Sequence, residues 1–222
     1  MPIYGVHMDS KAKILGNLRL PITDKLTNAI SEIRDSHIYR DYPTADEDLL
    51  QTFKARLSSL HGELYIAEST AEAAAFIARI IESQKNKTCL IQNVPLTRRI
   101  CNENKDLNKY LVQDLSMDSQ LLAKYEMSVT VADYLIARTG SIFLNSISAG
   151  GRRLSILPPI HMVVAEKKQI VRSLEDVLTR INSQASYSTI ITGPSRTADI
   201  EKQLVLGAHG PKRLIVVLLQ NT

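Results

Sequence analysis

The chain has 222 residues, 44% of them hydrophobic, which is enough for one well-filled α/β domain. Its 27 basic and 23 acidic residues are interspersed, the formal charge is +4, and Trp is absent, so the basic stripe with interleaved aromatics that is typical of nucleic-acid binding is missing. No apolar run reaches membrane-spanning length, and the first residues lack a signal-peptide pattern. We expect a soluble, cytoplasmic protein that binds neither nucleic acid nor membrane.

The first half of the chain alternates between helix and strand patterns. Residues 1–42 are expected to form an N-terminal helical arm, and residues 43–222 the α/β domain. Thr44 and Glu47 have the spacing of a capping box for a helix that ends at His61-Gly62. The next predicted elements are strand 63–67, helix 70–82 with its capping pair Ser69 and Glu72, strand 88–92, helix 96–104 and a short strand candidate at 110–112. This alternation predicts a mostly parallel sheet with helices on its faces.

A β-hairpin interrupts the alternation in the second half. Apolar runs at 134–137 and 142–144 flank Thr139-Gly140 at a spacing suited to a hairpin. The elements after it are a polar loop at 145–153, strand 160–165 and helix 174–181 with the capping pair Ser173 and Asp176. The predicted fold class is therefore α/β, with a mostly parallel central sheet flanked by helices and a β-hairpin insertion.

A turn at Gly193-Pro194 separates a predicted buried strand at 189–191 from a predicted helix at 195–207. The first N–H groups of a helix are unpaired and lie at the positive end of its dipole, so this turn suits an anion. Arg196 adds a permanent positive charge there. An equally weighted reading takes the hydroxyl residues of this turn as ordinary helix caps and Arg196 as solvated.

Two blocks of residues in the second half carry a family resemblance. The upstream block comprises Ala132-Asp133-Tyr134, Ile136-Ala137, Thr139-Gly140-Ser141, Gly151-Arg152, residues 154–158 and His161. The C-terminal block runs from Thr192 to Glu201 and continues with Leu206-Gly207 and His209-Gly210-Pro211. Together they closely resemble the LUD family, whose members are lactate-utilisation proteins. The resemblance implies the fold of glucosamine-phosphate isomerases, ribose-phosphate isomerases and CoA transferases; the residues alone leave a flavodoxin-like topology open.

Three polar segments follow apolar runs and are expected to meet beyond the carboxyl ends of the strands, where open α/β sheets bind ligands. The residues proposed to bind a carboxylate or phosphate are Thr139, Gly140, Ser141, Gly151, Arg152, Gly193, Ser195, Arg196 and Thr197. The match with the family motif favours this role for Arg152 and Arg196. Arg153 is read as a solvated loop residue.

His161 and Asp133 are the candidate catalytic residues, because both match the family motif. An imidazole exchanges protons near neutrality, although a satisfied core histidine is an equal alternative for His161. Asp133 is a candidate base or orienting partner of His161, and a structural carboxylate is at least as well supported. Arg138 stands where many family members have an acidic residue. No glutamate at a matching strand end suits a CoA-transferase mechanism.

The cysteine count excludes an iron–sulfur cluster bound by this chain alone. Only Cys89 and Cys101 are present, whereas such clusters require four ligands. Cys89 lies within an apolar run and is read as a small buried hydrophobe. No metal-ligand spacing and no dinucleotide fingerprint is present in the sequence, so no cofactor is expected in this chain.

The resemblance implies a clusterless subunit, catalytic or co-catalytic, of an iron–sulfur-dependent system that oxidises L-lactate to pyruvate. Its partners would be iron–sulfur lactate-utilisation proteins and a small anionic metabolite. An alternative is a stand-alone enzyme or sensor acting on a phosphorylated or CoA-linked metabolite. A purely structural interaction protein is a third hypothesis.

Overall fold

The computed structural model describes residues 48–112, 118–145, 152–180, 187–198, 204–206 and 210–220. The predicted N-terminal arm at 1–42, the domain boundary after it and the Thr44 and Glu47 capping pair lie outside these ranges, as do residues 146–151 of the polar loop. Every helix within the described ranges is too short or too polar to cross a membrane.

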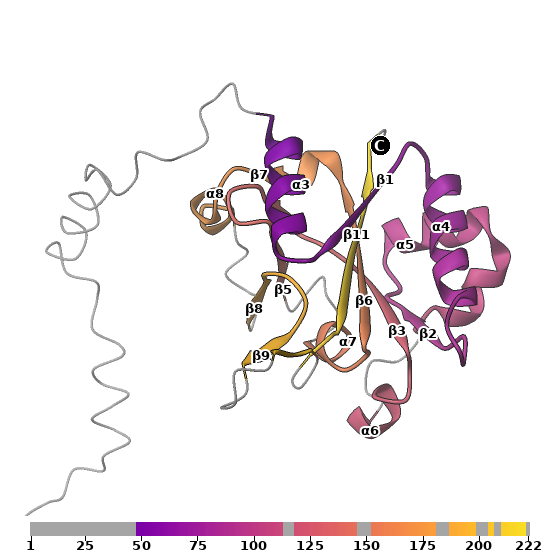
Figure 1. The fold of residues 1–222 in the computed structure, drawn as a ribbon. Coiled ribbons are helices and arrows are strands. Elements are labelled where there is room, and N and C mark those ends of the chain that lie inside the picture. Colours follow the sequence, from indigo (N-terminus) through magenta and orange to yellow (C-terminus); the bar gives the residue numbers. More distant parts are fainter. Residues whose placement is uncertain are drawn as a thin grey trace, which may run out of the picture. The chain divides into compact units, whose positions relative to one another are not determined.

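Five parallel strands form the central sheet in the order β1-β11-β6-β3-β2 (Figure 1). Their bounds are β1 Glu63–Ala67, β2 Cys89–Ile91, β3 Met127–Val131, β6 Ile160–Glu166 and β11 Arg213–Leu219. β11 and β6 pair along their whole length, from Arg213 with Ile160 to Leu219 with Glu166. A central parallel strand is covered on both faces, which explains the continuous apolar run of β11. The predicted mostly parallel sheet is confirmed.

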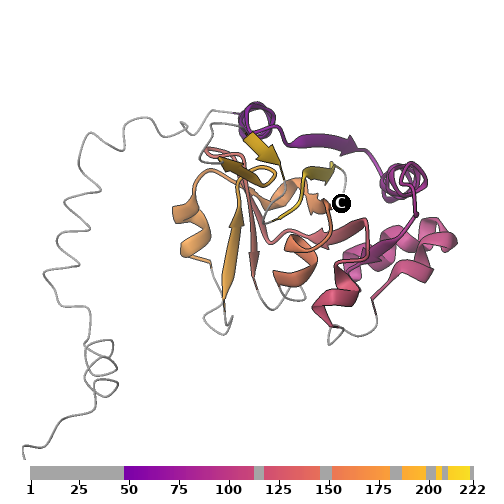
Figure 2. The ribbon, with the colours of Figure 1, turned by 60° about the horizontal axis from the view of Figure 1, so that its bottom comes forward.

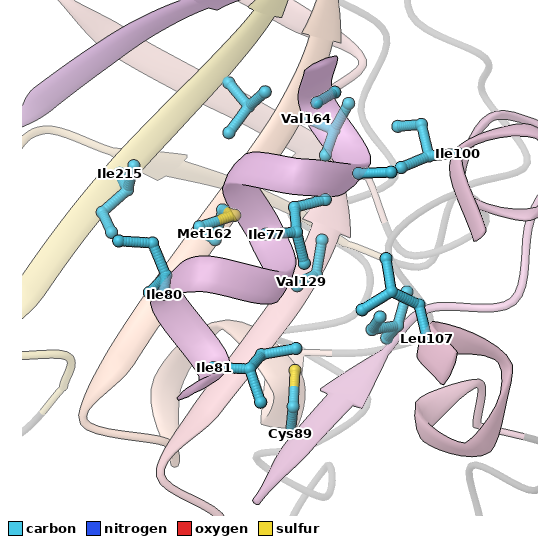
Figure 3. Close-up of a cluster of buried hydrophobic side chains, with 14 of the residues drawn as sticks. Ile77, Ile80, Ile81, Cys89, Ile100, Leu107, Val129, Met162, Val164 and Ile215 are labelled. Carbon is cyan, nitrogen blue, oxygen red and sulfur yellow. The ribbon is translucent and has the colours of Figure 1, made fainter. Parts of the chain in front are cut away.

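Helices α4 (Thr70–Glu82) and α5 (Pro95–Glu103) cover one face of this sheet, together with the 3₁₀ helix η2 (Lys105–Tyr110). The predicted start of α4 is confirmed, since the Ser69 hydroxyl accepts the N–H of Glu72 at 3.2 Å. Figure 3 shows Ile77 and Ile81 of α4 in the same buried cluster as Met162 of β6.

The short strand predicted at 110–112 is wrong, because the structure forms a single parallel bridge there between Leu111 and Ile91. The N–H of Val112 donates to the carbonyl of Ile91 at 2.8 Å. η2 buries Leu107 and continues to Tyr110, which leaves too few extended residues for a longer ladder.

A helix and a second sheet cover the opposite face of the central sheet. The helix, α3 (Leu49–Ser59), is capped by Asp48, whose Oδ1 accepts the N–H of Leu50 at 3.0 Å. The second sheet has the order β7-β4-β5-β8, with bounds Ile170–Val171, Tyr134–Ile136, Ser141–Asn145 and Ser188–Ile191. The remaining helices of the described residues are α6 (Ser119–Leu122), α7 (Arg152–Ile156), the 3₁₀ helix η3 (Lys167–Gln169) and α8 (Leu174–Leu178). Figure 2 shows the second sheet and α8 on the side of the molecule away from α4 and α5.

The predicted hairpin is confirmed, because β4 and β5 pair antiparallel around the Thr139-Gly140 turn. One other expectation about the second sheet is corrected. The strand before Gly193 is not buried: β8 pairs with β5 at the edge of the sheet, and Ile190 is 47% exposed. It therefore belongs to a second layer rather than to the central parallel sheet.

The helix predicted at 195–207 is wrong, and with it the expected helix N-terminus beside Gly193. The structure forms two antiparallel strands there, β9 (Arg196–Ala198) and β10 (Leu204–Leu206). Thr197 and Val205 are β-branched and lie opposite each other in this pair. Pairing between segments separated by several residues overrides the weak helical pattern that the single sequence displays.

Candidate functional site

His161 lies in the second position of β6, on the face of the central sheet opposite α4. Its neighbours Ile160 and Met162 belong to the core beneath α4, and successive side chains of a strand alternate between faces. The imidazole is fully buried, and Nε2 shares a hydrogen bond of 2.8 Å with Oγ1 of Thr130. Nδ1 is buried without a hydrogen-bond partner among the described residues. Burial lowers the pKa of His161 to about 3, so the imidazole is neutral at pH 7.

Two hydroxyl residues of β3 lie beside His161 on the same face. Ser128 pairs with His161 in the parallel ladder, Thr130 follows two residues later, and both are fully buried. The Ser128 hydroxyl donates to the carbonyl of Leu154 at 2.5 Å and thereby fixes α7 to the sheet. Sequence reasoning missed both residues. The sequence feature that could have identified them is a pair of hydroxyl residues at alternate positions of an apolar strand, because alternate residues lie on the same face of a sheet.

Asp133 holds the junction between the two sheets. Its Oδ2 accepts the backbone N–H of Asn145 at 2.7 Å, and its Oδ1 accepts the side-chain amide of Asn145 at 2.8 Å. Ser128, which pairs with His161, lies near the start of β3. Asp133 follows five residues later, beyond the carboxyl end of that strand. Asp133 thus lies near the carboxyl end of the central sheet, whereas His161 lies near the amino end.

The structure brings the Thr139-Gly140-Ser141 segment and the segment around Gly193 together. The hydroxyls of Ser141 and Thr192 share a hydrogen bond of 2.9 Å. Thr139 is exposed in the hairpin turn, and the N–H of the preceding Arg138 donates to the carbonyl of Arg172 at 3.1 Å. Arg138 therefore ties the hairpin turn to the end of β7 through its backbone.

The two glycines of these segments pack closely on α3 and the turn that ends it. Gly140 has φ +65, and a Cβ at this position would lie 2.6 Å from the backbone nitrogen of Leu57. Gly193 has φ +83, and its Cβ would lie 2.9 Å from the carbonyl oxygen of Leu60. Both positions require glycine, because the backbone has a positive φ and a side chain would overlap its neighbours. Packing therefore accounts for the presence of glycine at both positions without any contact to a ligand.

The remaining ligand-binding candidates lie on α7, on β9 and in the turn before β9. The N–H of Ser195 donates to the carbonyl of Pro211 at 2.8 Å, just before β11 begins, so this turn lies at the amino end of the central sheet and not at the predicted carboxyl end. Arg152 begins α7, while Arg196 and Thr197 lie on β9. Gly151 lies outside the described residues.

Polar side chains that the sequence analysis did not select occupy the carboxyl end of the central sheet. Glu166 ends β6, and its carboxylate lies 2.7 Å from Nζ of Lys168 and 3.7 Å from Nη2 of Arg99. Gln92 follows β2, is buried, and accepts the N–H of Val131 at 2.9 Å through Oε1. The Gln92 contact joins the ends of β2 and β3, and the Glu166 contact with Arg99 joins the end of β6 to α5. An acidic residue directly after an apolar strand was the available signal for Glu166.

Cys89 and Cys101 are free and buried, as expected for Cys89. Burial raises the pKa of the Cys101 thiol to about 11 and raises that of Cys89 even more strongly. A thiol in this state is a poor metal ligand, because the thiolate is the ligating form. Within the described part of the chain, no group of three or more His, Cys, Asp or Glu side chains is placed to hold a metal ion.

Comparison with known proteins places these features in a family. The chain is 37% identical over 101 residues to lactate utilization protein C of Bacillus pumilus, an alignment that covers 42% of each protein. It is 24% identical over 187 residues to lactate utilization protein C of Macrococcus caseolyticus, with 79% of each covered. The chain thus spans less than half of the first relative's length and about four fifths of the second's.

A solved structure supports the same fold. The crystal structure of a DUF162 family protein from Deinococcus radiodurans matches with a TM-score of 0.60 and 20% identity, covering 80% of this chain and 99% of the other. The family model described as the LUD domain matches residues 50–219, a stretch that includes both sheets. The chain therefore belongs to the LUD domain family.

Proposed function

We propose that this chain serves lactate utilisation as a subunit without a cluster of its own, acting with iron–sulfur proteins that oxidise L-lactate to pyruvate. The observation that carries the proposal is the LUD match over residues 50–219, together with relatives named lactate utilization protein C that align over 79% and 80% of their length. The fold alone would not suffice, because one fold supports many functions.

The proposal assigns electron transfer to partner proteins. Removing two electrons from lactate requires a redox carrier, and an iron–sulfur cluster requires four ligands. This chain has two cysteines, and burial keeps both as thiols. The cysteines of this chain are therefore too few to bind an iron–sulfur cluster. In the proposal the clusters belong to the partner proteins.

In the proposal His161 contacts a small carboxylate that binds against the buried face of β3 and β6. Its support is a neutral imidazole, fixed by Thr130, with one ring nitrogen unpaired among the described residues. A pKa of about 3 makes His161 a hydrogen-bonding group rather than a base at neutral pH. A bound carboxylate would raise this pKa by stabilising the imidazolium.

The other candidate residues have supporting roles in the proposal. Asp133 is a positioning residue, because its carboxylate is engaged by Asn145 at the junction of the two sheets. Arg152 and Arg196 supply positive charge for the anion, and Ser195, Thr197 and Gly151 complete the binding residues carried over from the family motif. Thr139, Gly140, Ser141 and Gly193 shape the turns that α3 supports.

The test is anaerobic affinity purification of the full chain from its native cells, with mass spectrometry and iron analysis of the proteins that co-purify. We expect stoichiometric iron–sulfur partners and lactate-dependent electron transfer by the assembled complex. An iron-free protein that instead binds a phosphorylated or CoA-linked metabolite by itself would contradict the proposal and favour the stand-alone alternative.

A further inference from the structure

A cavity of 290 Å³ lies between α4 and η2, on the side of the central sheet that faces away from His161. Its floor is formed by Ala78 and Ile81 of α4 and by Leu107 of η2. Ile81 and Leu107 are each only 2% exposed and belong to the core cluster beneath α4, which Figure 3 shows. The floor is therefore apolar and held in place by the core, as in a pre-formed ligand site.

The geometry of η2 places two rows of side chains along this cavity. Residues three apart in a 3₁₀ helix lie one above the other, so Leu107 and Tyr110 form one row and Asp106 and Lys109 the other. Asp106 and Lys109 are exposed, and the second row is therefore the rim through which a ligand can enter. This rim carries a carboxylate and an ammonium group one turn apart.

Both rim charges are available to a ligand. No ion pair within the described part of the chain includes Asp106 or Lys109. Nζ of Lys109 lies 4.9 Å from the centre of the Tyr110 ring, a contact that holds the ammonium group at the rim without an acceptor for its N–H groups. The other carboxylate of the cavity, Glu82, is already neutralised by Lys87, whose Nζ lies 2.5 Å away.

Asn104 adds a neutral hydrogen-bond donor to the cavity. Its Oδ1 accepts the backbone N–H of Asp106 at 3.1 Å, and its Nδ2 has no acceptor among the described residues. The opposite wall is fixed by Tyr110, whose hydroxyl donates to the carbonyl of Lys87 at 3.3 Å. The cavity thus presents an amide donor, a cation and an anion around an apolar floor.

This arrangement excludes three simple classes of ligand. The charge of Lys109 repels a small cation, and that of Asp106 repels a small anion. A neutral apolar molecule would displace water from both charges without replacing the lost hydrogen bonds, which is unfavourable. A molecule that carries both an ammonium and a carboxylate group meets each rim charge with the opposite sign.

We propose that the cavity between α4 and η2 binds a zwitterionic amino acid with an apolar side chain. Its ammonium group pairs with Asp106, its carboxylate with Lys109 and the amide of Asn104, and its side chain packs on the apolar floor. The volume of 290 Å³ is that of about ten water molecules, close to the number of heavy atoms in leucine or phenylalanine. This site is separate from the one in the proposed function.

Isothermal titration calorimetry of the full chain with L-leucine and L-phenylalanine tests the site. We expect saturable binding of at least one of them with a Kd of about 1 mM or lower. Leucinamide lacks the carboxylate, and N-acetyl-leucine lacks the ammonium group. Each should bind about tenfold more weakly than leucine, because each leaves one rim charge without a partner.

Charge variants assign the two ends of the ligand. Asp106→Asn should weaken leucine binding about tenfold and remove the preference for leucine over N-acetyl-leucine. Lys109→Gln should weaken it by a similar factor and remove the preference over leucinamide. The matched control is Lys105→Gln, at an exposed position of η2 that does not line the cavity, and it should keep the Kd within about twofold of the wild type.

A wild-type protein that binds neither leucine nor phenylalanine would overturn the proposal, as would equal affinities for leucine, leucinamide and N-acetyl-leucine. These comparisons use the wild type alone, so they decide the matter even if a variant fails to fold. Leucine affinity that is the same in Asp106→Asn, Lys109→Gln and the wild type would place the ligand elsewhere. None of these outcomes affects the proposed role in lactate utilisation, whose ligand binds on the other face of the sheet.

Discussion

Ser141 and Thr192, 51 residues apart in the chain, share a hydrogen bond of 2.9 Å that joins the two segments by which the family is identified. Each hydroxyl stands next to a glycine, Gly140 or Gly193, that packs on the C-terminal part of α3 or the turn that ends it. The family motif around this bond therefore describes a packing contact among a helix, a hairpin turn and the end of an edge strand. The following predictions test that contact and the buried polar groups of the protein.

Gly140→Ala is expected to destabilise the domain by about 2–4 kcal/mol, because a Cβ would combine a strained backbone with overlap onto α3. The φ of +65 disfavours an L side chain, and the Cβ would lie 2.6 Å from the nitrogen of Leu57. Urea unfolding measures the change. Thr139→Ala, in the same turn but exposed, is the control and should change stability by less than about 0.5 kcal/mol. Equal stabilities of the two variants would show that the turn does not depend on this packing.

Asp133 and Asn145 are expected to be strongly coupled. Asp133→Ala and Asn145→Ala should each destabilise the protein by about 1–3 kcal/mol, since each leaves a polar partner unpaired. The double variant should be more stable than the sum of the two losses predicts, and a double-mutant cycle by urea unfolding measures this coupling. Additive losses would mean that the two side chains act independently of each other.

His161 should make folding sensitive to acid. Its pKa is lowered from 6.5 to about 3 in the folded protein by burial, so between these values the unfolded chain binds a proton that the folded chain does not. The His161 contribution is complete above about pH 6.5. It then falls by about 1.4 kcal/mol for each pH unit of acidification until about pH 3. The difference in unfolding free energy between the wild type and His161→Phe, measured across this range, isolates the effect. Parallel pH profiles would rule out a buried neutral imidazole.

Both thiols should be unreactive in the folded protein. Burial raises the pKa of Cys101 to about 11 and raises that of Cys89 further, so little thiolate is present at pH 8 and neither sulfur is accessible. A thiol-reactive disulfide reagent should label neither cysteine at pH 8 and both in denaturant. Rapid labelling of the native protein would show that the core around α5 opens readily.

Local patterns were sufficient where the residues of an element themselves specify it. Alternation of helix and strand predicted the parallel sheet, and the capping pair Ser69 and Glu72 predicted the start of α4. The run at 160–165 predicted β6, because a strand buried on both faces is apolar throughout. In each case the residues that specify the element are neighbours in the sequence.

The sequence by itself determined the fold class, the family and the absence of enough cysteines for a cluster, since periodicity, motif order and composition are properties of the chain alone. Only the tertiary structure decided that residues 196–198 and 204–206 pair as antiparallel strands, because this pairing overrides the helical pattern that the sequence displays there. It also separated His161 from Asp133 and placed Thr130 against Nε2 of His161. The register between β3 and β6 determines which of their residues lie side by side. The local sequence of either strand alone does not specify that register.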